Sequence, residues 1–104
     1  MKRADVIRNI RQVAAEVLPR GSVLYLYGSR ARGDAHSGSD WDLLILLDKA
    51  RVTPADQDNI TYPMRELGWQ IDEMINPIMF TIDDWKAKSY TPFYKNVMKE
   101  GIVL

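Results

Sequence analysis

The chain has 104 residues, which predicts a single domain over residues 1–104 with a core of modest size. Its 14 basic and 14 acidic side chains cancel, so we expect no strong binding to nucleic acid through its phosphates. The absence of cysteine excludes disulfide scaffolds and cysteine catalysis. The longest apolar run, 43–47, is too short to cross a bilayer, and the first residues do not resemble a signal peptide, so we expect no membrane association and a cytoplasmic location.

The charge is unevenly distributed along the chain. Residues 1–33 carry seven basic and two acidic side chains, whereas residues 34–73 carry three basic and nine acidic ones. An acidic middle segment is either an ordinary solvated surface or a set of carboxylates gathered to bind a cation. The spacing of these acids has to decide between the two.

Hydrophobic periodicity predicts the elements of the first half. Apolar residues three and four apart predict a helix over 4–18, and a β-branched and aromatic run predicts a strand over 23–27. A short helix at 30–32 should end at Gly33. The almost wholly apolar run 41–47 predicts a second strand that is either covered on both faces or central in its sheet.

The second half reads as three helices and one strand. Threonine N-caps predict helices that begin after Thr53, Thr81 and Thr91. The first of these should either end near Tyr62 or kink at Pro63 and continue through Met64 and Leu67 to Gly68. We expect a third strand over 69–80, broken near Pro77. This order of elements predicts a small α/β domain.

The strand over 23–27 ends in Gly28-Ser29, where the next helix begins almost at once. Glycine permits a sharp turn and leaves room for a ligand against the backbone. The free N–H groups of a helix start, the Ser29 hydroxyl and the side chains of Arg30 and Arg32 would together suit nucleotide phosphates. A plain strand-to-helix turn capped by Ser29 explains the same residues, so a second signal is needed.

Asp40 and Asp42 supply that signal. Two residues apart at the start of a strand, they share one face of it. Two carboxylates beside an apolar segment repel each other, and a divalent cation would remove that cost. An Asp-x-Asp pair can bridge two Mg²⁺ ions about 3.5–4 Å apart. Both acids could instead cap the strand end in water, but their position shortly after the Gly-Ser turn predicts one site for a triphosphate and its metals.

The runs 28–34 (GSRARGD) and 39–44 (SDWDLL) resemble the signature of the DNA polymerase β-like nucleotidyltransferase superfamily. They resemble in particular the minimal nucleotidyltransferases of bacteria and archaea. The resemblance is specific over 22–47, and the element order extends it over most of the chain. It implies an α/β (α+β) fold in which a small mixed β-sheet has helices packed mainly on one face.

The resemblance also implies roles for these residues. Gly28 and Ser29 would hold the nucleotide phosphates. Asp40 and Asp42 would be catalytic and would bind the Mg²⁺ ions that activate the attacking hydroxyl and stabilise the leaving pyrophosphate.

Members of this superfamily usually have a third carboxylate on a later strand, and Asp72 is the candidate for this catalytic, metal-binding position. Its neighbour Glu73 would project to the opposite face of the expected strand, so only one of the two could reach the metals. Aspartate is the usual residue type, which favours Asp72. The Asp-Glu-Met sequence departs from the usual apolar–acid–apolar pattern, so the choice between the two acids stays open.

These implications describe an enzyme that transfers a nucleoside monophosphate, in the first place AMP, from ATP or another NTP to an acceptor hydroxyl with the help of Mg²⁺. Minimal nucleotidyltransferases are commonly paired with HEPN-domain toxins, so the resemblance implies a HEPN partner and an antitoxin role. The alternative is a binding module of the same fold that holds nucleotide or partner without turnover. Intact Gly28, Ser29, Asp40 and Asp42 favour the enzyme.

Overall fold

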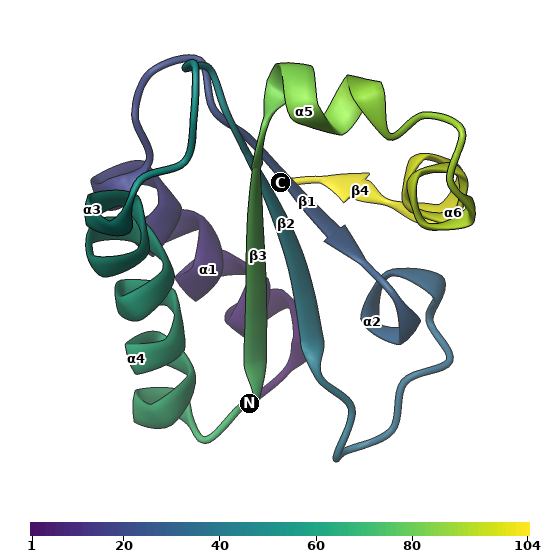
Figure 1. Ribbon diagram of the computed structural model, residues 1–104. Helices are drawn as coiled ribbons and strands as arrows, with labels where there is room; N and C mark the ends of the chain where they lie inside the picture. The colour runs from purple at the N-terminus through teal and green to yellow at the C-terminus, as the bar shows by residue number, and fades with distance from the viewer.

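A four-stranded mixed sheet forms the centre of the computed structural model, which describes residues 1–104 (Figure 1). The strand order is β3-β2-β1-β4, with β1 antiparallel to β2 and β4, and β3 parallel to β2. The strands are β1 (Val23–Tyr27), β2 (Trp41–Leu47), β3 (Ile75–Thr81) and β4 (Ile102–Val103). This architecture confirms the small α/β domain that the sequence predicts and the mixed sheet that the resemblance implies.

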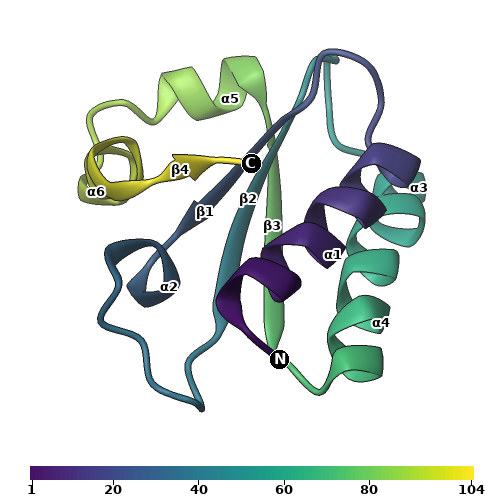
Figure 2. The same ribbon diagram turned by 180° about the vertical axis from the view of Figure 1, so that it is seen from behind.

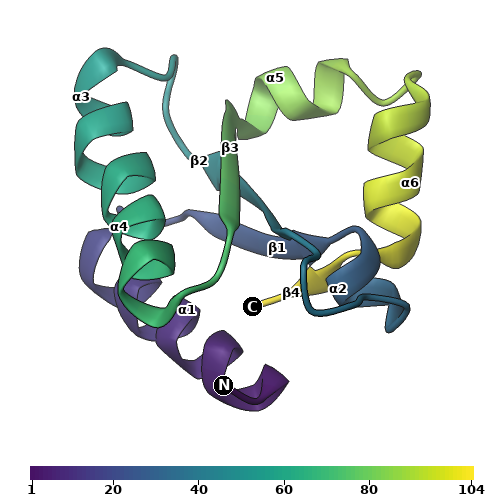
Figure 3. The same ribbon diagram turned by 90° about the horizontal axis from the view of Figure 1, so that it is seen from below.

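Helices lie on both sides of this sheet. The two longest, α1 (Arg3–Val17) and α4 (Tyr62–Ile71), pack side by side against one face (Figures 1 and 2). The shorter helices α5 (Ile82–Ala87) and α6 (Pro92–Glu100) lie on the other side, as the view in Figure 3 shows. No helix has both the length and the hydropathy required to span a membrane.

The central strand β2 is buried from both directions, as its apolar run predicts. Its odd-numbered side chains, including Leu43 and Ile45, join the cluster formed with α1 and α4, which has 14 buried residues. Its even-numbered residues Leu44 and Leu46 pack against Trp85 of α5 and Val97 of α6 in a cluster of 4 buried residues. Most of the core therefore lies between the sheet and the α1–α4 layer, in agreement with helices packed mainly on one face.

The segment that leads into α4 is longer and more continuous than the sequence predicts. Thr53 and Asp56 form the expected capping box at the start of α3 (Pro54–Asp56). A π-helical turn, η1 (Gln57–Thr61), then carries the chain directly into α4. Pro63 does not end the helix, because it directly follows the π-helical turn, where the regular i→i−4 hydrogen-bond pattern is already interrupted.

The third strand begins at Ile75 and not at residue 69, so its expected first half is wrong. Residues 69–71 continue α4, and Asp72 closes that helix in the left-handed conformation with φ 58°. The N–H of Glu73 donates to the Gly68 carbonyl at 2.9 Å, a bond typical of a helix C-terminus. Pro77 does not break β3, because β3 is an edge strand in which a missing N–H can face away from the sheet.

Candidate active site

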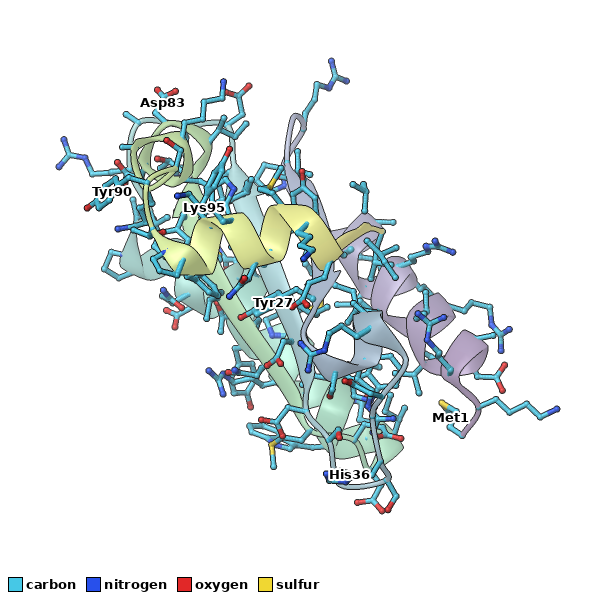
Figure 4. All side chains as sticks on the ribbon, turned by 90° about the vertical axis from the view of Figure 1, so that its right-hand side faces the viewer. Met1, Tyr27, His36, Asp83, Tyr90 and Lys95 are labelled. Carbon is cyan, nitrogen blue, oxygen red and sulfur yellow. The ribbon has the colours of Figure 1, made fainter.

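The expected site residues meet where β1 ends and β2 begins. Tyr27 of β1, Asp42 of β2 and Asn76 of β3 are register neighbours, so they form a row across three strands. Their positions alternate with the residues that face α1 and α4, which places them on the side of the sheet that carries α5 and α6. Figure 4 views the protein from this side, with Tyr27 between α6 and the short helix α2 (Ser29–Arg32).

Gly28 brings the turn into direct contact with Asp42. It precedes α2 with φ 75° and ψ −159°, a conformation that is essentially restricted to glycine. A Cβ at this position would stand 2.5 Å from Asp42 Oδ2. The structure therefore brings together the two halves of the predicted site, the Gly28-Ser29 turn and the Asp-x-Asp pair.

Asp42 is half-buried, and Asp40, just before the strand, is exposed. Burial raises the pKa of Asp42 above its ordinary value, and the negative charge of Asp40 raises it further. The Asn76 amide donates to Asp42 Oδ1 at 3.3 Å, and this bond, together with the charge of Arg32, acts in the opposite direction on the pKa. The net increase shows that the ionised Asp42 lacks full compensation, which is the condition that a bound cation would relieve.

The phenol of Tyr27 is not prepared for nucleophilic attack. Burial and the charge of Asp42 raise the pKa of Tyr27 to about 12, so the hydroxyl is neutral at physiological pH. Its ring packs edge-on against Phe93 of α6 at 5.6 Å. Tyr27 therefore forms part of the wall of the site.

Arg30 and Arg32 leave α2 in different directions. The Arg30 guanidinium donates to the Ser39 carbonyl at 2.9 and 3.2 Å and lies 4.6 Å from the centre of the Trp41 ring. It also forms a 3.8 Å ion pair with Glu73. The expected nucleotide-binding residue Arg30 is thus engaged with the loop before Asp40, and its contacts hold that loop in place.

Arg32 turns toward the C-terminal end of α6. Its Nη1 lies 3.2 Å from both carboxylate oxygens of Glu100, and its Nε lies 3.2 Å from Asp34 Oδ2. Hydrogen bonds from Arg32 to Asp34 and Glu100 raise its pKa. Glu100 Oε1 also accepts the N–H of Gly28 at 3.3 Å. Glu100 is a site residue that the sequence analysis missed, since 72 positions separate it from Gly28.

The placement expected for Asp72 and Glu73 is wrong. Asp72 ends α4, and it lines an open pocket of about 420 Å³ with the 37–39 loop. Glu73 accepts the Trp41 indole N–H at 3.2 Å. No three acidic, histidine or cysteine side chains lie close enough together to hold a metal ion, so Asp72 does not join the Asp-x-Asp pair. The cause is the strand boundary, because neither acid belongs to β3.

Asn76 stands where β3 passes Asp42. On the neighbouring strand, an amide and not a third carboxylate therefore stands beside Asp42. With the correct start of β3, the alternation of side chains would have identified Asn76 from the sequence.

Oxygen ligands are what Mg²⁺ prefers, and the side chains of Asp40, Asp42 and Asn76 all offer them. Because Gly28 has no side chain, the backbone of the turn lies directly against the Asp42 carboxylate. The residues present therefore fit a hard divalent cation, with two carboxylates and one amide in place of three carboxylates.

Comparison with known proteins identifies the family of this chain. The family model described as polymerase beta, nucleotidyltransferase matches residues 9–104. A search of curated proteins found no match.

Similar solved structures include a protein assigned as a minimal nucleotidyltransferase, with a TM-score of 0.68 and 22% identity over 100% of this chain and 97% of that one. A toxin–antitoxin structure with AMP-PNP has a TM-score of 0.65 and 18% identity over 92% of this chain and 69% of that one. A variant of the toxin–antitoxin pair MntA–HpeT has a TM-score of 0.60 and 16% identity over 94% and 69% of the two chains. At these identities the structures show a shared fold, and together with the family match they establish that this chain belongs to the polymerase β family of nucleotidyltransferases.

Proposed function

We propose that this nucleotidyltransferase moves AMP from ATP to an acceptor hydroxyl in a Mg²⁺-dependent reaction. The observation that carries the proposal is the contact between the Gly28-Ser29 turn and Asp42, where a Cβ on Gly28 would stand 2.5 Å from the carboxylate. A triphosphate bound at the turn would lie directly beside the carboxylates that hold its metals.

Different residues of the chain would bind the metal and the phosphates. Asp40 and Asp42 would hold Mg²⁺, and the cation would offset the burial and the Asp40 charge that together raise the pKa of Asp42. When bound, Mg²⁺ would supply positive charge that stabilises the transferring nucleotidyl group and the leaving pyrophosphate, and it would lower the pKa of a coordinated hydroxyl. The Ser29 hydroxyl and the first N–H groups of α2 would bind phosphate oxygens.

We further propose that the chain is the antitoxin of a toxin–antitoxin pair and that a HEPN-domain toxin supplies the acceptor hydroxyl. Support comes from the fold shared with toxin–antitoxin structures, one of which contains AMP-PNP. Another is an MntA–HpeT variant with two aspartates, two positions apart, changed to glutamate. This is the spacing of Asp40 and Asp42. Because ATP is the proposed substrate, the activity would take place in the cytoplasm.

Ser29→Ala tests the phosphate site. A hydrogen bond to a charged group is worth roughly 1.5–3 kcal/mol, so loss of the hydroxyl is expected to raise the Kd for Mg²⁺–ATP about tenfold to a hundredfold. Calorimetric titration measures the affinity, and circular dichroism confirms that the fold is retained. Ser37→Ala, in the exposed part of the 34–39 loop, is the matched control and should bind like wild type. Equal affinity of the two variants would place the phosphates elsewhere.

Asn76 favours a second candidate function, a nucleotide-binding module with weak or no turnover. Its amide stands 3.3 Å from Asp42 Oδ1, at the position where a third carboxylate would strengthen metal binding and prepare the acceptor. The two functions share the same nucleotide site and differ only in whether transfer follows binding.

Asn76→Asp tests how much a third carboxylate beside Asp42 would strengthen Mg²⁺ binding. A third acid beside Asp42 is expected to lower the Mg²⁺ concentration needed for half-maximal ATP binding by about tenfold, because ligand charge sets cation affinity. Without metal, the variant should unfold at lower temperature, since the amide donor is replaced by a like charge. Asn59→Asp, an exposed residue of η1, carries the same charge change and should alter neither property. An unchanged Mg²⁺ requirement in Asn76→Asp would show that no metal is bound beside Asp42.

A further inference from the structure

Glu100 places a carboxylate on two groups that are suited to binding a phosphate. Its Oε1 accepts the N–H of Gly28 at 3.3 Å, and both of its oxygens lie 3.2 Å from Arg32 Nη1. A backbone N–H and a guanidinium are the donors that typically bind phosphate oxygens. Glu100 therefore already occupies an anion position at the edge of the Gly28-Ser29 turn.

The electrostatics of α6 do not account for this placement. Glu100 is the last residue of α6, where the helix dipole disfavours a negative charge. The contacts of Glu100 with Gly28 and Arg32 lie 72 and 68 positions away in sequence, so they join the C-terminal end of the chain to the turn. Arg32 forms ion pairs with Glu100 on one side and with Asp34 on the other.

The ion pair between Arg32 and Glu100 is accessible enough for another anion to replace the Glu100 carboxylate. The side chain of Glu100 is 23% exposed and that of Arg32 is 46% exposed, so solvent screens their attraction. Breaking a solvent-screened ion pair of this kind typically changes an equilibrium constant by no more than about fivefold. A triphosphate brings several negative charges to the same donors and can displace a single carboxylate.

We propose that Glu100 is a specificity-determining residue of the phosphate site, where its carboxylate holds the anion position until a nucleotide phosphate replaces it. This inference rests on the proposed function, because it requires that nucleotide binds at the Gly28-Ser29 turn. Glu100 thus competes with every anion for Arg32 and Gly28, and only a ligand with additional contacts, such as a metal-bound triphosphate, overcomes that competition.

Glu100→Gln tests the competition. Glutamine keeps the shape of the side chain and an acceptor for the Gly28 N–H, but it removes the negative charge. The Kd for Mg²⁺–ATP is expected to fall about two- to fivefold, the range that corresponds to an exposed ion pair. The gain should shrink in high salt, because the charges involved are exposed. In an Arg32→Ala background, the same change should bring little further gain.

Two additional variants keep the test decisive. Glu66→Gln, an exposed residue of α4 on the opposite side of the sheet, makes the same charge change and should leave ATP affinity unaltered. Glu100→Asp withdraws the carboxylate by one methylene, so it should raise affinity by a smaller factor, and it replaces Glu100→Gln if that variant does not fold.

The outcomes separate this inference from the proposed function. Weaker or unchanged ATP binding in Glu100→Gln, with wild type binding normally and Ser29→Ala impaired, would overturn the competition and leave the proposed function intact. If wild type and Glu100→Gln both fail to bind Mg²⁺–ATP, both proposals fail.

Discussion

Gly28→Ala is expected to abolish measurable binding of Mg²⁺–ATP and to lower the free energy of unfolding by about 2–4 kcal/mol. The backbone at Gly28, with φ 75° and ψ −159°, is strained for any residue with a Cβ. That Cβ would also stand 2.5 Å from Asp42 Oδ2, so the carboxylate would have to leave its position. In a domain of this size the loss corresponds to a decrease in Tm of roughly 10 °C or more, which thermal unfolding measures directly.

Gly33→Ala provides the matched control at the other end of α2. Gly33 also has a positive φ, 88°, but no heavy atom lies within 4 Å of the position its Cβ would take. This variant carries backbone strain without the contact, so it should lose about 1 kcal/mol and bind ATP normally. If Gly28→Ala and Gly33→Ala had the same stability and the same affinity for ATP, the contact with Asp42 would not explain why position 28 requires glycine.

Asp42→Asn is expected to reduce AMP transfer by at least about a hundredfold, because an amide is a weaker ligand for Mg²⁺ than a carboxylate. Mg²⁺–ATP should also stabilise the variant less than wild type against heat, since a ligand stabilises the native state only in proportion to its binding. The assay measures AMP on the cognate partner by intact mass, together with the Tm at several nucleotide concentrations.

The fold of this variant should survive the change. Because burial raises the pKa of Asp42, the protonated form of this carboxyl favours folding and the ionised form opposes it. The stability that protonation contributes is present at low pH and is lost as the pH rises through the folded-state pKa. Metal-free Asp42→Asn should therefore be at least as stable as wild type at neutral pH. Asp72→Asn, at the end of α4, is the matched control and should transfer normally. Loss of transfer in Asp72→Asn with activity retained in Asp42→Asn would reverse this assignment.

The sequence predicts the part of the site that lies on short, strongly patterned elements. The bounds of β1 and β2 match the expected ones, because each is a continuous apolar run ended by polar residues or glycine. Gly28 directly follows β1, and Asp42 lies on β2 opposite Tyr27, the last residue of β1. The contact between Gly28 and Asp42 follows from this pairing.

The errors come from residues whose local pattern is ambiguous. Trp69 and Ile71 resemble a strand in composition, but they continue α4, and the left-handed Asp72 that ends the helix has no glycine to reveal it. Because of this boundary error, the third carboxylate was expected at Asp72, which lies outside β3, and Asn76 was not considered. Glu100 could not be predicted, because its contact with Gly28 depends on how α6 packs and not on spacing in the chain.

The most direct test of the central claim follows the two ends of the triphosphate. The chain is incubated with its cognate partner, Mg²⁺ and ATP labelled either at the α-phosphate or at the γ-phosphate. We expect label on the partner from α-labelled ATP only, no label without a divalent cation, and none with Asp42→Asn. Label from γ-labelled ATP would identify phosphoryl transfer instead, and the absence of any label from a wild type that binds Mg²⁺–ATP would contradict the enzyme in favour of the binding module.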